Sequence, residues 1–264
     1  MKLILKYLKL LLLITFISCD DLIEYSPYDT DNITIEKNQN SKNLKFILNQ
    51  YFNAKILKIA ITNCTHEHYN HVRKFVSLIN NRKDVNFVIF LGDFTVSGTI
   101  KEYQWFDEIV KNLNKPYIVA VGNHDSRGNG HYLYKQIYGE YNFSFKLGNY
   151  HFIFADGSLW GDIDIEEHKK VFDPLFKDTK LENYRIFLSH VPYWFGISKI
   201  DKVEASYNYL LSKDISLMIF GHLHYYYDGQ LFGHKHLYIN EIEEGSYTIL
   251  NLNNNTYDVQ KVNF

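Results

Sequence analysis

Polar side chains that can bind metal ions follow five apolar runs of the sequence, each at the point where the run ends. The five clusters are Asn63-Cys64-Thr65-His66, Gly92-Asp93, Gly122-Asn123-His124-Asp125, Ser189-His190 and Gly221-His222-Leu223-His224. Imidazole, carboxylate and amide oxygen are common metal ligands, and a thiolate is a softer one. Each cluster alone could be ordinary turn chemistry, because Gly-Asp and Gly-Asn pairs are frequent in turns. Five in succession favour a metal site.

Strand patterns alternate with helix patterns over the first three clusters. We expect strands at Leu57–Thr62, Val85–Leu91 and Tyr117–Val121, and helices at His71–Asn80 and Ile100–Leu113. The last two of these strands end in continuously apolar runs, which is typical of strands buried on both faces. This order predicts a largely parallel sheet covered by helices. Because functional groups gather at the carboxyl ends of such strands, we expect the clusters to meet.

The second half of the chain continues the alternation and ends in a hairpin. The expected elements are two strands within Asn142–Asp156, a helical stretch at Ile165–Lys177, a strand at Tyr184–Ser189, a helix at Val203–Ser212, a strand at Ser216–Phe220, and terminal strands at Lys235–Glu241 and within Ser246–Phe264. Residues 56–264 are therefore predicted to form a single α/β domain.

From Leu57 onward, the clusters resemble the motifs of the calcineurin-like metallophosphoesterase family. That family has, in order, Asp-x-His, Gly-Asp-x-x-x-x-Gly, Gly-Asn-His followed by Asp or Glu, a single His, and Gly-His-x-His; four of the five match fully in this chain. The resemblance implies a four-layer α-β-β-α sandwich. It also implies hydrolysis of a phosphoester by water that two divalent metal ions acidify.

The resemblance implies a role for each matched residue. The first ion would be held by Cys64, His66, Asp93 and His224, and the second by Asp93, Asn123, His190 and His222. His124 would be the catalytic histidine, facing the phosphoryl group and its leaving group. Asp125 would orient the ring of His124, since a catalytic histidine needs a second group to fix its tautomer.

The first motif departs from the family, because Cys64 stands where the family has an aspartate. In one interpretation Cys64 binds the ion as a thiolate, which tilts the expected ions (Zn, Mn or Fe) toward zinc or iron. In the other it is a small buried thiol, and the first ion has lost a ligand. Even then His66, Asp93 and His224 could hold a zinc-like ion with an open position. His68 and His71 lie nearby and could compensate, although the exposed start of a helix is the favoured interpretation of both.

Two further alternatives follow from this departure. A register slip of one residue would put Asn63 in the place of the aspartate, but His66 would then leave its ligand position. The competing function is a degenerate member of the family that binds a phosphorylated ligand or a partner without turnover. Cys64 is the feature that favours it.

The N-terminus has the pattern of a bacterial lipoprotein signal. Met1–Lys9 carries three lysines, and Leu10–Ile17 is an apolar run shorter than the roughly 20 residues of a membrane span. The residues before Cys19 resemble a lipobox, which predicts removal of residues 1–18 and lipidation of Cys19; a plain signal peptide is the alternative. Residues 19–55 would comprise the lipidated N-terminus, a polar tether over Asp20–Asn43 and a short amphipathic stretch beginning at Ser41. We therefore expect a chain anchored in the bacterial cell envelope.

Charge and composition limit the classes of partner that the chain could bind. The 28 basic and 30 acidic residues give a net charge of −2, without a basic cluster, so we expect no nucleic-acid footprint. An aromatic content of 17% is too high for a disordered chain. The expected partners are a phosphorylated substrate and, through the lipid, a membrane.

Overall fold

The computed structural model describes residues 26, 28–30, 33–158, 165–177, 184–192, 200–231, 233–253 and 256–264. The predicted signal segment and Cys19 lie outside these ranges. Within them, the structure contains no helix with the length and apolar character that crossing a membrane requires.

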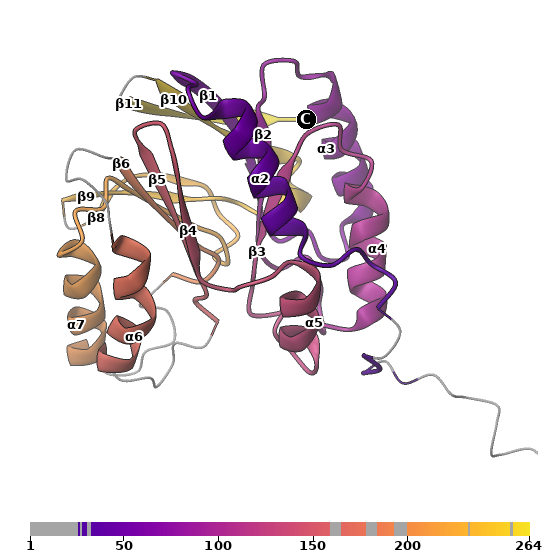
Figure 1. Cartoon of the computed structure of the whole chain (residues 1–264), viewed down its shortest axis with the longest axis horizontal. Helices are drawn as coiled ribbons and strands as arrows, with labels where there is room; N and C mark the ends of the chain where they lie inside the picture. The colour runs from indigo at the N-terminus through magenta and orange to yellow at the C-terminus, as the bar shows by residue number, and fades with distance from the viewer. Residues whose placement is uncertain are drawn as a thin grey trace, which may run out of the picture.

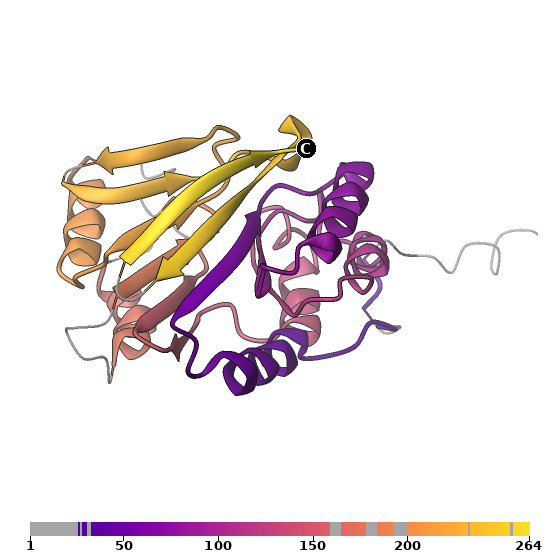
Figure 2. The ribbon, with the colours of Figure 1, turned by 90° about the horizontal axis from the view of Figure 1, so that it is seen from above.

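The first sheet contains the strands that carry the first three clusters. Its order is β11-β10-β1-β2-β3. The bounds are β1 Ile56–Thr62, β2 Phe87–Leu91, β3 Tyr117–Ala120, β10 Ser246–Asn253 and β11 Thr256–Asn263. Strands β1, β2 and β3 are parallel, while β10 pairs antiparallel with β1 and with β11. Figure 2 shows the terminal hairpin lying alongside β1.

The second sheet has the order β4-β5-β6-β7-β9-β8. Its bounds are β4 Phe143–Leu147, β5 Tyr150–Ala155, β6 Tyr184–Ser189, β7 Leu217–Phe220, β8 Tyr227–Leu231 and β9 His234–Tyr238. The four inner strands are parallel, and both edge strands are antiparallel to their neighbours. Strand β8 was not predicted, because it lacks an apolar run and forms only by pairing with β9.

Helices cover the outer faces of both sheets. The bounds are α2 Gln39–Tyr51, α3 Tyr69–Asn81, α4 Ile100–Val110, α5 Gly130–Ile137, α6 Ile165–Phe172 and α7 Ile200–Leu211, with 3₁₀ turns η1 Asp173–Phe176 and η2 Ile242–Glu244. Figure 1 shows α3 and α4 on one side and α6 and α7 on the other, with the sheets between them. One apolar core lies between the sheets and one under each helical layer. This four-layer α-β-β-α arrangement confirms the expected fold class.

Alternation along the inner strands explains how continuous apolar runs serve two cores. In β1, Ala60 packs in the core under α3 and α4, whereas Ile59 and Ile61 pack between the sheets. Successive strand side chains point to opposite faces, so an element that is buried on both faces must be apolar throughout. The helix α5 was not predicted. Its buried face of Leu133, Tyr134 and Ile137 lies in a segment that otherwise reads as a polar loop.

The expected tether is partly wrong. From residue 33 onward the segment packs on the domain: Ile35 is in the core, and helix α2 begins at Gln39 rather than at Ser41. The buried side chain of Asn40 donates to the carbonyl of Val119 at 2.8 Å and accepts from its N–H at 2.9 Å. Asn40 thereby pairs the outer edge of β3, which no strand covers in the described sheet. The polar segment around Asn40 therefore covers the edge of β3 instead of forming a spacer.

Candidate metal centre

Asp93 joins the loops of the two sheets. It follows β2 with a left-handed backbone (φ 53°) and is buried. Its Oδ2 lies 2.9 Å from Nε2 of His190, which follows β6 in the other sheet. Its Oδ1 accepts a hydrogen bond of 2.9 Å from the backbone N–H of His124, which follows β3. A Cβ atom at Gly122 would lie 2.2 Å from Oδ1, so only glycine leaves room for this carboxylate.

Hydrogen bonding fixes the ring of His190 with one nitrogen facing Asp93. Its Nδ1 lies 2.7 Å from the carbonyl oxygen of Leu91, and because a carbonyl only accepts, Nδ1 carries a hydrogen. Such a bond is the usual outer support of a histidine that ligates metal through its other nitrogen. Burial lowers the pKa of His190, but the charge of Asp93 outweighs it, so the pKa lies above its ordinary value. For Asp93, burial is opposed by the charge of His190, which brings that pKa below its usual range.

Two groups of ligand atoms share Asp93. One comprises Cys64, Asp93 and His190, the other His66, Asp93 and His124, and within each group the atoms lie within 4.8 Å of one another. The structure thus brings together residues from four of the five predicted clusters. Shared carboxylates of this kind can bridge two ions.

Two of the predicted ligand atoms are buried without a hydrogen-bond partner among the described residues. They are Oδ1 of Asn123 and Nδ1 of His66. Buried polar atoms are normally paired, so each calls for an explanation. Divalent cations would satisfy both, and the residues present therefore fit a metal centre.

The two histidines of the last motif have different neighbours. The ring of His222 lies 5.5 Å from that of His190, centroid to centroid. The Nδ1 of His224 lies 3.0 Å from Oε2 of Glu241, a residue that the sequence analysis did not single out. Burial lowers the pKa of His222 to about 4 and also lowers that of His66. Both rings are therefore neutral at pH 7, which is the form that binds metal.

Cys64 is buried in the first-motif loop with a left-handed backbone (φ 47°). Its Sγ contacts the side-chain oxygen of Asn63 at 3.2 Å, and its backbone N–H donates to the carbonyl of Gly92 at 3.1 Å. Burial and the charge of Asp93 raise the pKa of the thiol well above its usual value. A thiolate at this position would require a bound cation to stabilise its charge. Cys64 as a thiolate ligand and Cys64 as a buried neutral thiol therefore both stay open.

The role expected for Asp125 is wrong: its carboxylate organises the loop after β2 instead of orienting His124. Its oxygens accept hydrogen bonds from the backbone N–H groups of Asp93, Phe94, Thr95 and Gly122 and from the hydroxyl of Thr95, at 2.8–3.0 Å. Burial and the charge of Asp93 raise the pKa of Asp125 to about 7, although the hydrogen bonds from the backbone N–H groups lower it. The side chain therefore positions Asp93 through the backbone.

Replacing Asp125 by asparagine is expected to destabilise the fold. An amide has one oxygen, so its NH₂ group would face at least two of the buried N–H donors. Each unpaired buried donor costs about 1–3 kcal/mol. Urea denaturation of Asp125→Asn, with the exposed Asp258→Asn as control, measures the loss. Unchanged stability together with a fall in kcat would restore the original assignment.

His124 is held by groups that were not predicted. Its Nδ1 lies 2.9 Å from the carbonyl of Val96, so Nδ1 donates and Nε2 is left to face Nη2 of Arg127 at 3.1 Å. Arg127 is exposed and also donates from Nη1 to Val96 at 3.1 Å. It lies three residues after His124 in sequence, but nothing in the motif marked it.

Glu102 supports the same loop from helix α4. Its carboxylate accepts from the backbone N–H groups of Val96, Ser97 and Thr99, and Thr99 completes a capping box. The signal was present in the sequence as Thr-x-x-Glu at the start of an expected helix. Glu102 is thus a positioning residue for the loop that carries Asp93.

Comparison with known proteins agrees with this geometry. The model of the calcineurin-like phosphoesterase family matches residues 57–226, more than half of the chain. The chain belongs to the calcineurin-like phosphoesterase family. The family match covers all five clusters of the candidate centre, and its name denotes the hydrolysis of phosphoesters.

Relatives of this phosphoesterase include two named phosphodiesterases. A segment of 52 residues is 50% identical to a protein of Arcobacter nitrofigilis named a probable glycerophosphodiester phosphodiesterase, covering 19% of each chain. A segment of 69 residues is 36% identical to a phosphodiesterase of Methanocaldococcus jannaschii, covering 26% of this chain and 37% of the relative. The matched segments thus span well under half of these relatives.

Solved structures share the fold of this phosphoesterase. GAP50, the anchor in the inner membrane complex of Plasmodium, has a TM-score of 0.61 at 14% identity, with 79% of this chain and 84% of that chain covered. Purple acid phosphatase PPD1 from yellow lupin seeds has a TM-score of 0.60 at 13% identity, with 78% and 51% covered. At such identities the likeness concerns the fold alone.

Proposed function

We propose that this phosphoesterase hydrolyses phosphodiesters with two divalent ions held around Asp93. The observation that carries the proposal is the sharing of the buried Asp93 carboxylate between two groups of ligand atoms from both sheets. The names of the two bacterial and archaeal relatives support the diester class.

The proposed holders of the two ions follow the family's motifs, which divide the ligands differently from the two groups around Asp93. The proposed holders of the ions are Asp93 for both, Cys64, His66 and His224 for the first, and Asn123, His190 and His222 for the second. When bound, the ions acidify water and neutralise charge on the phosphoryl oxygens. The soft Cys64 sulfur favours zinc or iron over magnesium and calcium.

His124 is proposed to act on the leaving group. Its Nδ1 donates to Val96, and its Nε2 accepts from Nη2 of Arg127 at 3.1 Å, because a guanidinium only donates. Nε2 would take up a proton once Arg127 turns to the substrate. The P–O bond to the leaving group breaks as water adds to phosphorus, and His124 gives its Nε2 proton to the departing oxygen. Arg127, beside Nε2, would place its guanidinium on a phosphoryl oxygen.

Metal removal should abolish diester turnover. The full-length chain, purified in detergent, is expected to hydrolyse bis(4-nitrophenyl) phosphate faster than 4-nitrophenyl phosphate. Dialysis against a chelator should remove the activity, and Zn²⁺ or Mn²⁺ should restore it. A preference for the monoester would contradict the diester class, and activity that survives verified metal removal would contradict the metal mechanism.

We also propose that Cys19 is lipidated after removal of residues 1–18 and anchors the chain in the bacterial cell envelope. The proposal rests on the basic and apolar segments before Cys19. A mass spectrum of the mature N-terminal peptide tests it. A diacylated or triacylated Cys19 is expected, and an unmodified residue at that position contradicts the anchor.

A further inference from the structure

The segment that follows β9 is fastened to the first-motif loop. The side-chain amide of Asn63 donates to the carbonyl of Ile239 at 3.0 Å, and the backbone N–H of Ile242 donates to the carbonyl of Asn63 at 3.2 Å. Asn63 immediately precedes Cys64. These two bonds hold Glu241, at the start of turn η2, beside the position where the family's aspartate is missing.

Glu241 faces one ligand atom assigned to the proposed first ion. Its Oε2 lies 3.0 Å from Nδ1 of His224, and its side chain is only 16% exposed. Together with His68 and Glu243 it forms a third group whose ligand atoms lie within 4.8 Å of one another. The charge of Glu241 also acts on the Cys64 thiol.

An ion pair alone is a weak reason for this arrangement. His224 is 44% exposed, and pairs at that exposure contribute about 0–1 kcal/mol. His222 and His224 both have left-handed backbones, at φ 65° and 57°. Such conformations cost on the order of 1–3 kcal/mol each in non-glycine residues and cluster at functional sites. The backbone strain at His222 and His224 exceeds the small stabilisation that the ion pair can give. We take this as a sign that a ligand binds between His224 and Glu241.

We propose that Glu241, with His224, supplies the carboxylate that the cysteine at position 64 withholds from the first metal ion. The His224 nitrogen and the Glu241 oxygen, 3.0 Å apart, would both hold the first ion. Glu241 would then supply the carboxylate that an aspartate at position 64 would have given the site. The inference rests on the proposed dinuclear function and changes only which residue completes the first site.

Metal stoichiometry of the full-length chain tests this assignment without reference to turnover. The metal-free protein is titrated with Zn²⁺, and bound zinc is counted by elemental analysis after dialysis. Two ions are expected in the wild type. Glu241→Gln and His224→Gln should each lower the affinity for one of the two ions by at least about 10–100-fold. Loss of a mere hydrogen-bond partner of a metal ligand already lowers affinity by that much.

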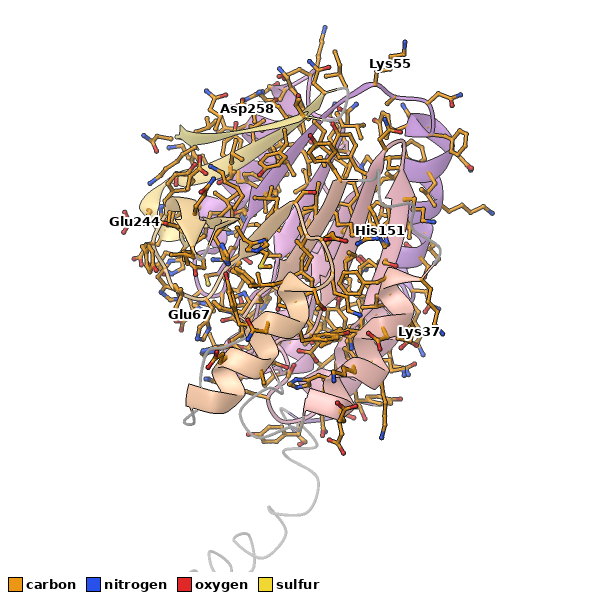
Figure 3. The ribbon with its side chains drawn as sticks, turned by 90° about the vertical axis from the view of Figure 1, so that its left-hand side faces the viewer. Lys37, Lys55, Glu67, His151, Glu244 and Asp258 are labelled. Atoms are coloured by element: carbon orange, nitrogen blue, oxygen red, sulfur yellow. The ribbon has the colours of Figure 1, made fainter. Side chains whose placement is uncertain are left out.

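A neighbour on the same turn serves as the control. Glu244 is exposed at the outer edge of the molecule (Figure 3), and Glu244→Gln should bind both ions like the wild type. Glu243 belongs to the group with His68 and Glu241, so loss of an ion in Glu243→Gln would place that ion in the His68 group and overturn the proposal. Unchanged zinc binding in Glu241→Gln also overturns it, while diester turnover by the wild type would leave the proposed function standing. A wild type with neither a second ion nor turnover refutes both.

Discussion

Replacing Asp93 by asparagine is expected to remove both ions and to bring phosphodiester turnover to background. The carboxylate is the one member common to the groups with Cys64 and His190 and with His66 and His124. Loss of an outer partner of a ligand already costs about 10–100-fold in metal affinity, and loss of a shared ligand should exceed that for each ion. Elemental analysis and diester turnover measure the two effects.

The variant should fold, because His190 can lose its proton once the charge of Asp93 is gone, and the hydrogen bond to Leu91 remains. Asp258→Asn, exposed on β11 (Figure 3), is the matched control and should retain both ions. Full zinc content in Asp93→Asn would show that Asp93 is not a ligand. Loss of only one ion would show that it does not bridge.

Replacing His124 by alanine should lower kcat by about 10²–10⁴-fold, the usual contribution of a general acid. The effect should depend on the leaving group: an alkoxide needs the proton, whereas nitrophenolate leaves readily without it. We therefore expect a larger fall for an alkyl phosphodiester than for bis(4-nitrophenyl) phosphate. Comparing kcat for the two substrates separates proton donation from a structural defect.

His71→Ala on helix α3 is the matched control for His124→Ala and should change neither substrate's kcat. An equal fall for both substrates in His124→Ala, with one ion lost, would make His124 a ligand of the group with His66 and Asp93. Unchanged kcat would remove it from the mechanism.

Local sequence patterns were sufficient for most of the fold and for the residues around Asp93. The strand β6 has the predicted bounds of Tyr184–Ser189, because a continuous apolar run between polar turns leaves few alternatives. The carboxyl ends of the parallel strands β1, β2 and β3 bring His66, Asp93 and His124 together. The packing of the two sheets then brings His190 to 2.9 Å from Asp93, which the motif order alone does not predict.

Contacts between loops explain what the sequence analysis missed. Asp125 follows His124 directly, which suggested that the two side chains interact, yet the backbone turns Asp125 into the protein toward the N–H groups after β2. Glu241 reaches His224 only because β9 lies next to β7 in the sheet. The edge-capping role of Asn40 likewise depends on where β3 ends up in the fold, which a polar sequence does not reveal.

Diester turnover by the zinc-loaded, full-length chain, compared directly with Cys64→Asp, tests the central claim that this phosphoesterase is catalytic despite its altered first motif. We predict turnover in the wild type that falls to background in Asp93→Asn, and a change of rate rather than its first appearance in Cys64→Asp. Background turnover in the zinc-, manganese- or iron-loaded wild type, with activity appearing in Cys64→Asp, would contradict the account. That result would identify the natural chain as a non-catalytic member of the family.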